Sequence, residues 1–201
     1  MQYGLILAHV EVPAPEVKTT YVDVPFGNGA IDYTDYFGEV KYKNREIQMN
    51  FICIAPWDEH DRMNSMLNRE VHGKHMKISF SNDQEFYWLG RVMVESWNYE
   101  EGKAVVVINA IVEPYKYKLR PTIVTRQISG SGTVFLKNLQ KSVCPLITST
   151  DTMTFVYNNK SVVHNAGEEW RLADLVFGSE GASVNITGTG TVTFEYQEGS
   201  L

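Results

Sequence analysis

The chain has 201 residues, a length that allows one large β domain or two small ones with real cores. Hydrophobic residues make up 43% and aromatic residues 12%, which excludes a disordered chain, and 15 glycines beside these aromatic residues favour an all-β class. The formal net charge of −6 argues against specific nucleic-acid binding, because that function needs a basic face to replace phosphate counterions.

The sequence carries no sign of secretion or of a membrane span. Its first residues lack the basic region and long apolar core of a signal peptide, and no apolar run approaches the thickness of a bilayer. Cys53 and Cys144 lie far apart, and Cys53 falls within an apolar strand pattern, so a disulfide framework is not expected. We therefore expect no signal-directed secretion and no membrane partner.

Alternating side chains near the N-terminus predict strands at Tyr3–Val12, Lys18–Val24 and Arg45–Ile54. Prolines end the first strand in an extended linker, because proline removes a ladder donor and restrains the residue before it. A turn with two glycines follows the second strand, and the next segment is rich in Tyr and Asp. Four aromatic residues of this region are either core-facing anchors or contacts for a partner chain: Phe26, Tyr33, Tyr36 and Phe37.

A short amphipathic helix is predicted after Pro56. Apolar residues recur at the spacing of one helix face, at Met63, Met66, Leu67 and Val71. Asp58 stands where an N-cap belongs, since its carboxylate could accept hydrogen bonds from the first unpaired amides. Gly73 is the expected stop, because glycine tolerates the left-handed conformation that follows a last turn.

After the helix the period changes to two, which indicates strands. Gly90 and two polar turns divide the pattern into strands at Met76–Phe80, Glu85–Leu89, Arg91–Tyr99 and Ala104–Val112. The strand Ala104–Val112 is apolar on both faces, so we expect it to be covered on both sides and to lie centrally.

The composition shifts to Thr, Ser, Gly and Asn after Arg120-Pro121, which predicts two domains at 1–120 and 121–201. Many short strands with turn signals between them favour a sandwich or jelly roll for the second domain. In this pattern Gly188-Thr189-Gly190 is interpreted as a hairpin turn between the last two strands. The predicted strands are Gly132–Phe135, Cys144–Ile147, Met153–Tyr157, Ser161–His164, Trp170–Leu172, Ala182–Thr187 and Thr191–Tyr196.

Several short motifs of the first 120 residues occur in an order that points to a known family. They are Gly29–Thr34, Asn44–Ile47, Val71–Lys74, Leu89–Val92 and Pro114–Tyr117. In this order they resemble the N-terminal domain of the distal tail proteins, which form the hub at the tail tip of bacteriophages and prophages with long non-contractile tails. The resemblance implies an all-β fold with one short helix: an N-terminal β-sandwich with a helix and an extra hairpin, then a small galectin-like C-terminal β-sandwich.

The same resemblance implies a structural function at the virion tail tip, after assembly in the cytoplasm of the host bacterium. In the family, N-terminal domains form a homo-hexameric ring that joins the major tail tube protein to the tail-associated lysin or tail fibre. The second domains point outward, toward receptor-binding or baseplate proteins. We expect a plain adaptor, because about 80 residues leave little room for added carbohydrate-binding domains.

No constellation of residues indicates catalysis, so we expect no enzyme, no catalytic residue, no cofactor and no metal. His72 and His75 are spaced HxxH, but they flank Gly73 and need not face one point, and further zinc ligands are not evident. A helix C-terminal His that complements the helix dipole is the simpler interpretation. No nucleophile elbow, phosphate loop or dinucleotide fingerprint appears.

One segment of the second domain could bind a saccharide. Its Trp could stack on a sugar ring while polar neighbours bond hydroxyl groups, at His164, Asn165, Trp170 and Arg171. The spacing differs from that of galectins, so fold similarity does not carry sugar binding with it. An ordinary buried Trp beside a turn is the competing interpretation. The alternative function is therefore a stand-alone carbohydrate-binding module for host cell-wall or capsular saccharides.

Overall fold

The computed structural model describes residues 4–36, 38–100 and 103–201. Strands dominate it, and the described residues contain one α-helix, so the predicted all-β class with one short helix is confirmed. The chain divides into two compact units, Met1–Ser79 with Trp88–Pro114 and Phe80–Tyr87 with Tyr115–Leu201. The division of the sequence into domains at 1–120 and 121–201 stays a prediction about independent folding.

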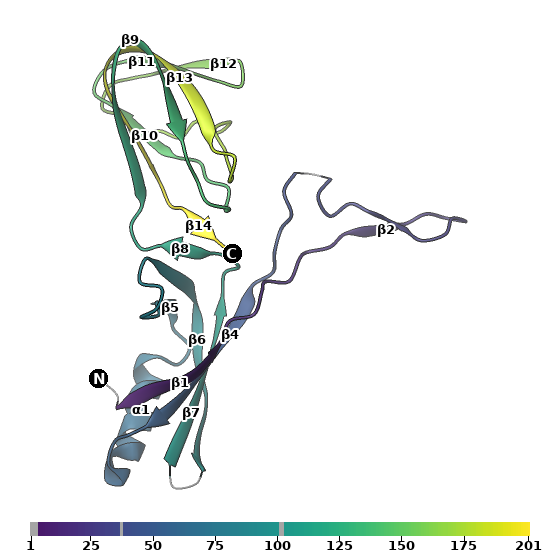
Figure 1. Ribbon diagram of the computed structural model, residues 1–201, viewed down its shortest axis with the longest axis vertical. Coiled ribbons are helices and arrows are strands. Elements are labelled where there is room, and N and C mark those ends of the chain that lie inside the picture. The colour runs from purple at the N-terminus through teal and green to yellow at the C-terminus, as the bar shows by residue number, and fades with distance from the viewer. Residues whose placement is uncertain (1–3, 37, 101–102) are drawn as a thin grey trace. The chain divides into compact units, whose positions relative to one another are not determined.

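The first unit is built on an antiparallel sheet with the order β1-β4-β7-β6, and β5 pairs with the other edge of β6 (Figure 1). β7 lies between β4 and β6, as its apolar character on both faces predicted. The strands are β1 (Leu5–Glu11), β4 (Arg45–Cys53), β5 (His75–Ile78), β6 (Phe86–Glu100) and β7 (Lys103–Val112).

The helix α1 (His60–Glu70) follows a 3-10 turn, η1 (Trp57–Glu59). Met63 and Leu67 are buried, and Met63 packs with Cys53 and Ala104 of the sheet, so the predicted apolar face is confirmed. The prediction of Asp58 as N-cap is wrong. The chain already turns at Pro56 and enters η1, so Glu59 takes the cap position and makes no side-chain capping bond.

Glycines in the strands correct two sequence predictions. Gly90 does not break a strand: β6 runs through it, because a Cβ there would lie 2.2 Å from the Ile111 carbonyl oxygen and only glycine allows this approach of β7. Gly188 and Gly190 likewise do not form a hairpin turn. They lie inside β13 (Ala182–Tyr196), where added Cβ atoms would collide with Met153 and Asp151.

The second unit has a five-stranded sheet in which β13 pairs with β9 along its whole length. The opposite edge of β13 pairs with β11 through its first half and with β10 through its second half. Large buried side chains fill one core, among them Phe155, Phe194, Leu136 and Leu175. The remaining strands are β9 (Thr122–Leu136), β10 (Leu146–Ser149), β11 (Met153–Tyr157) and β12 (Lys160–His164).

The C-terminus of the chain returns to the start of the second unit. β14 (Gly199–Ser200) pairs with β8 (Lys116–Lys118), and β8 pairs with Phe86 and Tyr87 at the beginning of β6. Tyr87 and Tyr117 are buried there and their ring centroids lie 5.8 Å apart. The last residues therefore help to build the fold.

Candidate functional site: an exposed arm and the polar corner of the second unit

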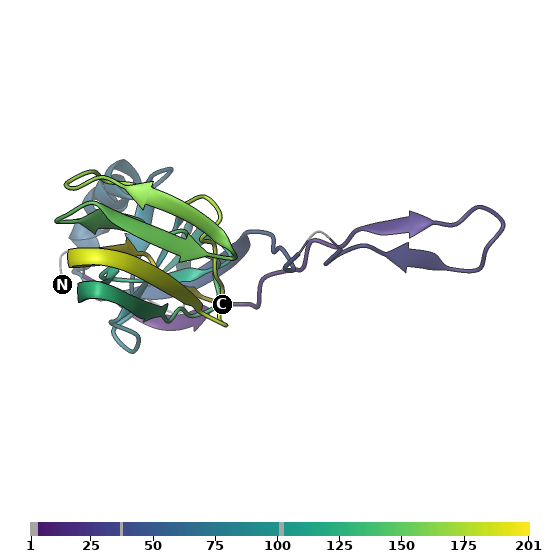
Figure 2. The same ribbon diagram turned by 90° about the horizontal axis from the view of Figure 1, so that it is seen from above.

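The described residues between β1 and β4, 12–36 and 38–44, form an extended arm, called here the β-arm. Its centre is a two-stranded ribbon of β2 (Tyr21–Asp23) and β3 (Ala30–Asp32), drawn as an isolated hairpin in Figure 2. None of its described residues is buried. A two-stranded ribbon without a packed face is marginally stable alone in water, so the β-arm needs support from its base or from a partner.

The base of the β-arm is held by hydrogen bonds and by one buried cation. Lys18 donates its amide to the Lys41 carbonyl at 2.8 Å. Arg45, where the arm returns to the sheet, donates to the carbonyls of Pro13 and Pro114 at 3.0 and 3.1 Å and stacks over Trp88 at 4.4 Å. Burial lowers the pKa of Arg45. Arg45 therefore anchors the point at which the arm leaves the sheet.

The distal part of the β-arm exposes apolar side chains to solvent. Val22 pairs with Ile31, so the two side chains share one face, and Tyr21 is 60% exposed on the other. Exposed apolar groups gathered on one element mark an interaction surface more often than a random scatter does. The large exposed apolar residues of the arm are Val12, Val17, Tyr21, Val22, Val24, Phe26, Ile31 and Tyr36.

Three of the four aromatic residues that the sequence offered as interface contacts lie on the described part of this arm. Phe26 is fully exposed at the tip of the hairpin, with φ of +63°. Tyr33 and Tyr36 contact each other edge to face at 5.2 Å, and Tyr36 is 68% exposed, so the core alternative does not apply to it. Phe37 lies outside the described residues. Their role as contacts stays a prediction.

The four residues proposed for saccharide contact are divided between core and surface. The rings of His164 and Trp170 stack at 5.1 Å, with His164 buried and Trp170 half-buried against Phe155. Asn165 and Arg171 are exposed, and Arg171 donates to the Cys144 carbonyl. Saccharide contact by this set stays a prediction, in which Asn165 and Arg171 present their polar groups to solvent.

A buried Ser–His pair in the second unit escaped sequence reasoning, because its members are 15 residues apart with no motif between them. Ser149 Oγ lies 3.0 Å from His164 Nδ1 and donates its proton to the Asp151 carbonyl at 2.9 Å. His164 must therefore donate through Nδ1, which is the opposite of activating a serine nucleophile. Both side chains are buried, so the pair belongs to the core.

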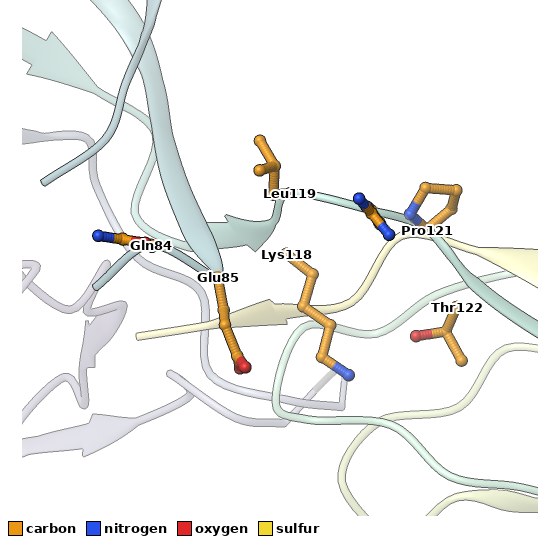
Figure 3. Close-up of a pocket in the computed structure, with 7 residues that line it drawn as sticks. Gln84, Glu85, Lys118, Leu119, Pro121 and Thr122 are labelled. Atoms are coloured by element: carbon orange, nitrogen blue, oxygen red, sulfur yellow. The ribbon is translucent and has the colours of Figure 1, made fainter. Parts of the chain in front are cut away.

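A pocket of about 500 Å³ lies beside β8 in the second unit (Figure 3). In that view the Lys118 ammonium lies between the Glu85 carboxylate and the Thr122 hydroxyl. The lining of the pocket thus includes both acidic and basic side chains. The pocket is lined by Gln84, Glu85, Lys118, Leu119, Arg120, Pro121 and Thr122.

A buried carboxylate, Glu198, binds two side chains that line this pocket and so forms the polar corner of the second unit. Glu198 accepts from Lys118 Nζ at 2.5 Å and from the Thr122 hydroxyl. Burial and the nearby charge of Glu198 raise the pKa of Tyr196 to about 12, and the Tyr196 hydroxyl donates to the Lys137 carbonyl. These bonds satisfy Glu198 within the chain, so it serves the fold.

Residues 4–36, 38–100 and 103–201 carry neither a cluster of metal-binding side chains nor a membrane-spanning helix. Within them, no group of three or more His, Cys, Asp or Glu side chains is placed to hold a metal ion. His72 accepts a hydrogen bond from the Val94 amide at 3.1 Å, which gives it a structural contact to β6. No described helix is long and apolar enough to cross a membrane.

These observations define an all-β protein of two units with an exposed, apolar hairpin arm. The fold is shared with SPP1 Dit (gp 19.1), whose crystal structure presents it as a paradigm of the hub adsorption apparatus in phages that infect Gram-positive bacteria. The TM-score is 0.70 at 16% sequence identity, over 100% of this chain and 95% of that one. The resemblance to distal tail proteins is thus confirmed in the fold. No family model and no curated protein matches the sequence.

Proposed function

We propose that this chain is a structural protein of a bacteriophage tail-tip hub, in which copies join head to tail into a closed ring. The single observation that carries the proposal is the β-arm. It exposes apolar residues on a hairpin with no core of its own, on a fold shared along the whole chain with SPP1 Dit. A heterologous contact of this kind must close into a ring or grow into a filament.

Burial of the apolar side chains of the β-arm would stabilise such a contact between copies. Burying a Val, Ile or Phe side chain completely contributes about 1.5–3 kcal/mol. Phe26 is fully exposed and Val22 and Ile31 are about half exposed, so together they offer about 4 kcal/mol per arm before the costs of association are subtracted. Six arms acting in one closed ring reinforce each other, because the last contact is intramolecular.

The partners follow from the hub role. The first unit, with the β-arm, would form the wall of a homo-hexameric ring between the major tail tube protein and the tail-associated lysin or tail fibre. The second unit would carry receptor-binding or baseplate proteins. The pocket beside β8 supports this assignment, since its mixed charges suit a peptide segment. The location would be the virion tail tip.

The test compares the ring-forming tendency of matched variants. The purified chain is measured by light scattering and negative-stain imaging, beside the double variant Val22→Asp/Ile31→Asp and the control Val163→Asp, an exposed valine of the second unit. We expect rings for the wild type and the control and monomers for the arm variant, with equal melting temperatures. Rings that persist in the arm variant, or a wild type that stays monomeric at high concentration, would contradict the arm-based ring.

The alternative of a stand-alone saccharide binder has its own readout. A glycan array is probed with the wild type and with Asn165→Ala and Arg171→Ala, since both side chains are exposed and their removal spares the core. Binding of a wall saccharide that both variants lose, by a chain that forms no ring, would support the alternative. Rings without saccharide binding would support the hub.

A further inference from the structure

A second exposed aromatic surface lies in the first unit, on elements other than the β-arm. Trp57 of η1 and Tyr99 of β6 are 63% and 48% exposed, and their ring centroids are 4.5 Å apart with an interplanar angle of 44°. We call this pair the aromatic notch. The two rings pack against each other at a tilt, so they do not form one flat platform.

A buried histidine supports the notch from beneath. The His60 ring stacks on Tyr99 at 5.8 Å and packs against Trp57 at 5.2 Å and Trp97 at 5.9 Å. His60 Nε2 lies 3.0 Å from the Ala55 carbonyl, so it carries the ring proton and donates it. His60 is 4% exposed, and its Nδ1 has no hydrogen-bond partner in the part of the chain that the structure describes. His60 therefore packs the start of α1 against the end of β6, and its Nδ1 is a buried acceptor without a partner among the described residues.

The chain that follows Trp57 is acidic. Asp58, Glu59 and Asp61 are exposed in η1 and the first turn of α1, and none of them forms an ion pair within the described ranges. Arg62 is the basic residue of this stretch. Lys103 follows in β7, but Tyr99 pairs with Ala104, so strand alternation places Lys103 on the opposite face of the sheet. The exposed residues that follow Trp57 in the chain thus carry a net negative charge.

We infer that the aromatic notch is a docking site for a Lys- or Arg-bearing segment of a protein partner. An ammonium or guanidinium group over the faces of Trp57 or Tyr99 gains a cation–π attraction, and the free carboxylates beside it complement its charge. Trp and Tyr are among the residues most enriched in binding hot spots. Because the two rings are tilted, they offer no flat platform to the broad face of a sugar ring, whereas a single cationic side chain needs only one ring face. The site uses no residue of the β-arm and stands without ring formation.

The partner segment is searched for with a library of random short peptides displayed on a surface. Peptides are selected on the wild-type chain and depleted on Trp57→Ala. We expect the enriched peptides to contain Lys or Arg at a defined position. Enrichment of peptides without basic residues, or recovery of none that Trp57→Ala depletes, would overturn the inference.

The best peptide is then made synthetically and its affinity measured by calorimetry against matched variants. We expect a loss of about tenfold with Trp57→Leu, which keeps an apolar side chain but removes the π face, and a smaller loss with Asp58→Asn/Asp61→Asn. Added salt should weaken binding to the wild type more than to the Asn variant. Val163→Ala, equally exposed elsewhere, should bind as the wild type. Equal affinities for all variants would contradict the site.

Two controls keep the result decisive. Trp57 is largely solvated, so Trp57→Leu should have the same melting temperature as the wild type. If Trp57→Leu lowers the melting temperature, Tyr99→Leu is the second test variant. The same proteins are applied to a glycan array. Saccharide binding that Trp57→Leu abolishes, together with an empty peptide selection, would assign the notch to a sugar and overturn the peptide proposal.

Discussion

Gly90→Ala tests why a strand in the first unit contains a glycine at all. The added Cβ would stand 2.2 Å from the Ile111 carbonyl oxygen and 2.5 Å from Val112 Cα, whereas ordinary contact begins at 3.4 Å. The obstacle is backbone, which cannot rotate away, so β6 and β7 must separate. Overpacking of this kind costs about 3 kcal/mol, the upper part of its usual range.

The comparison variant is Gly73→Ala, which has open space for its Cβ but a φ of +76°. Its free energy of unfolding should fall by only about 1 kcal/mol, because alanine is strained in the left-handed conformation. Urea unfolding is followed by Trp fluorescence, because three of the four tryptophans, Trp57, Trp88 and Trp97, belong to the first unit. If Gly90→Ala shifts the midpoint no further than Gly73→Ala, the close approach of β6 and β7 does not explain the glycine.

Two further predictions concern titration. The pKa of Asp32 is lowered by hydrogen bonds from the Thr34 hydroxyl and amide. Ionised Asp32 therefore contributes to folding stability above the ordinary Asp pKa, and this contribution is lost as pH falls through the lowered pKa. Thr34→Ala should raise the pKa of Asp32 in an NMR titration. The pKa of Tyr196 is raised to about 12, so protonated Tyr196 contributes to folding stability below the ordinary pKa of 10.0, and this contribution is lost as pH rises toward 12. Tyr196→Phe should remove this alkaline loss in pH-dependent melting, and an unchanged pH profile would contradict the assignment.

Two of the side-chain contacts described above join groups that are far apart in sequence. Tyr99 and Trp57 meet only because α1 packs on the sheet through Met63 while β6 returns alongside β7. Ser149 and His164 meet across β10 and β12 in a different core. Neither pair stands in a motif, so neither could be recognised before the fold was known.

The sequence alone determined the all-β class, the apolar helix face at Met63 and Leu67, and the central place of β7. These are local properties, because side-chain period reports which face of an element is buried. Short motifs in a fixed order were also enough to identify the resemblance to distal tail proteins, which the fold confirms.

Only the tertiary structure decided that Gly90, Gly188 and Gly190 lie inside long strands, since the collisions they avoid come from residues distant along the chain. It also decided that the segment between β1 and β4 is an arm without a core. A pattern such as Tyr21-Val22-Asp23 reads as a half-buried strand. Whether anything covers its apolar face depends on pairing and packing that period does not record, and in this chain the described residues leave that face to solvent.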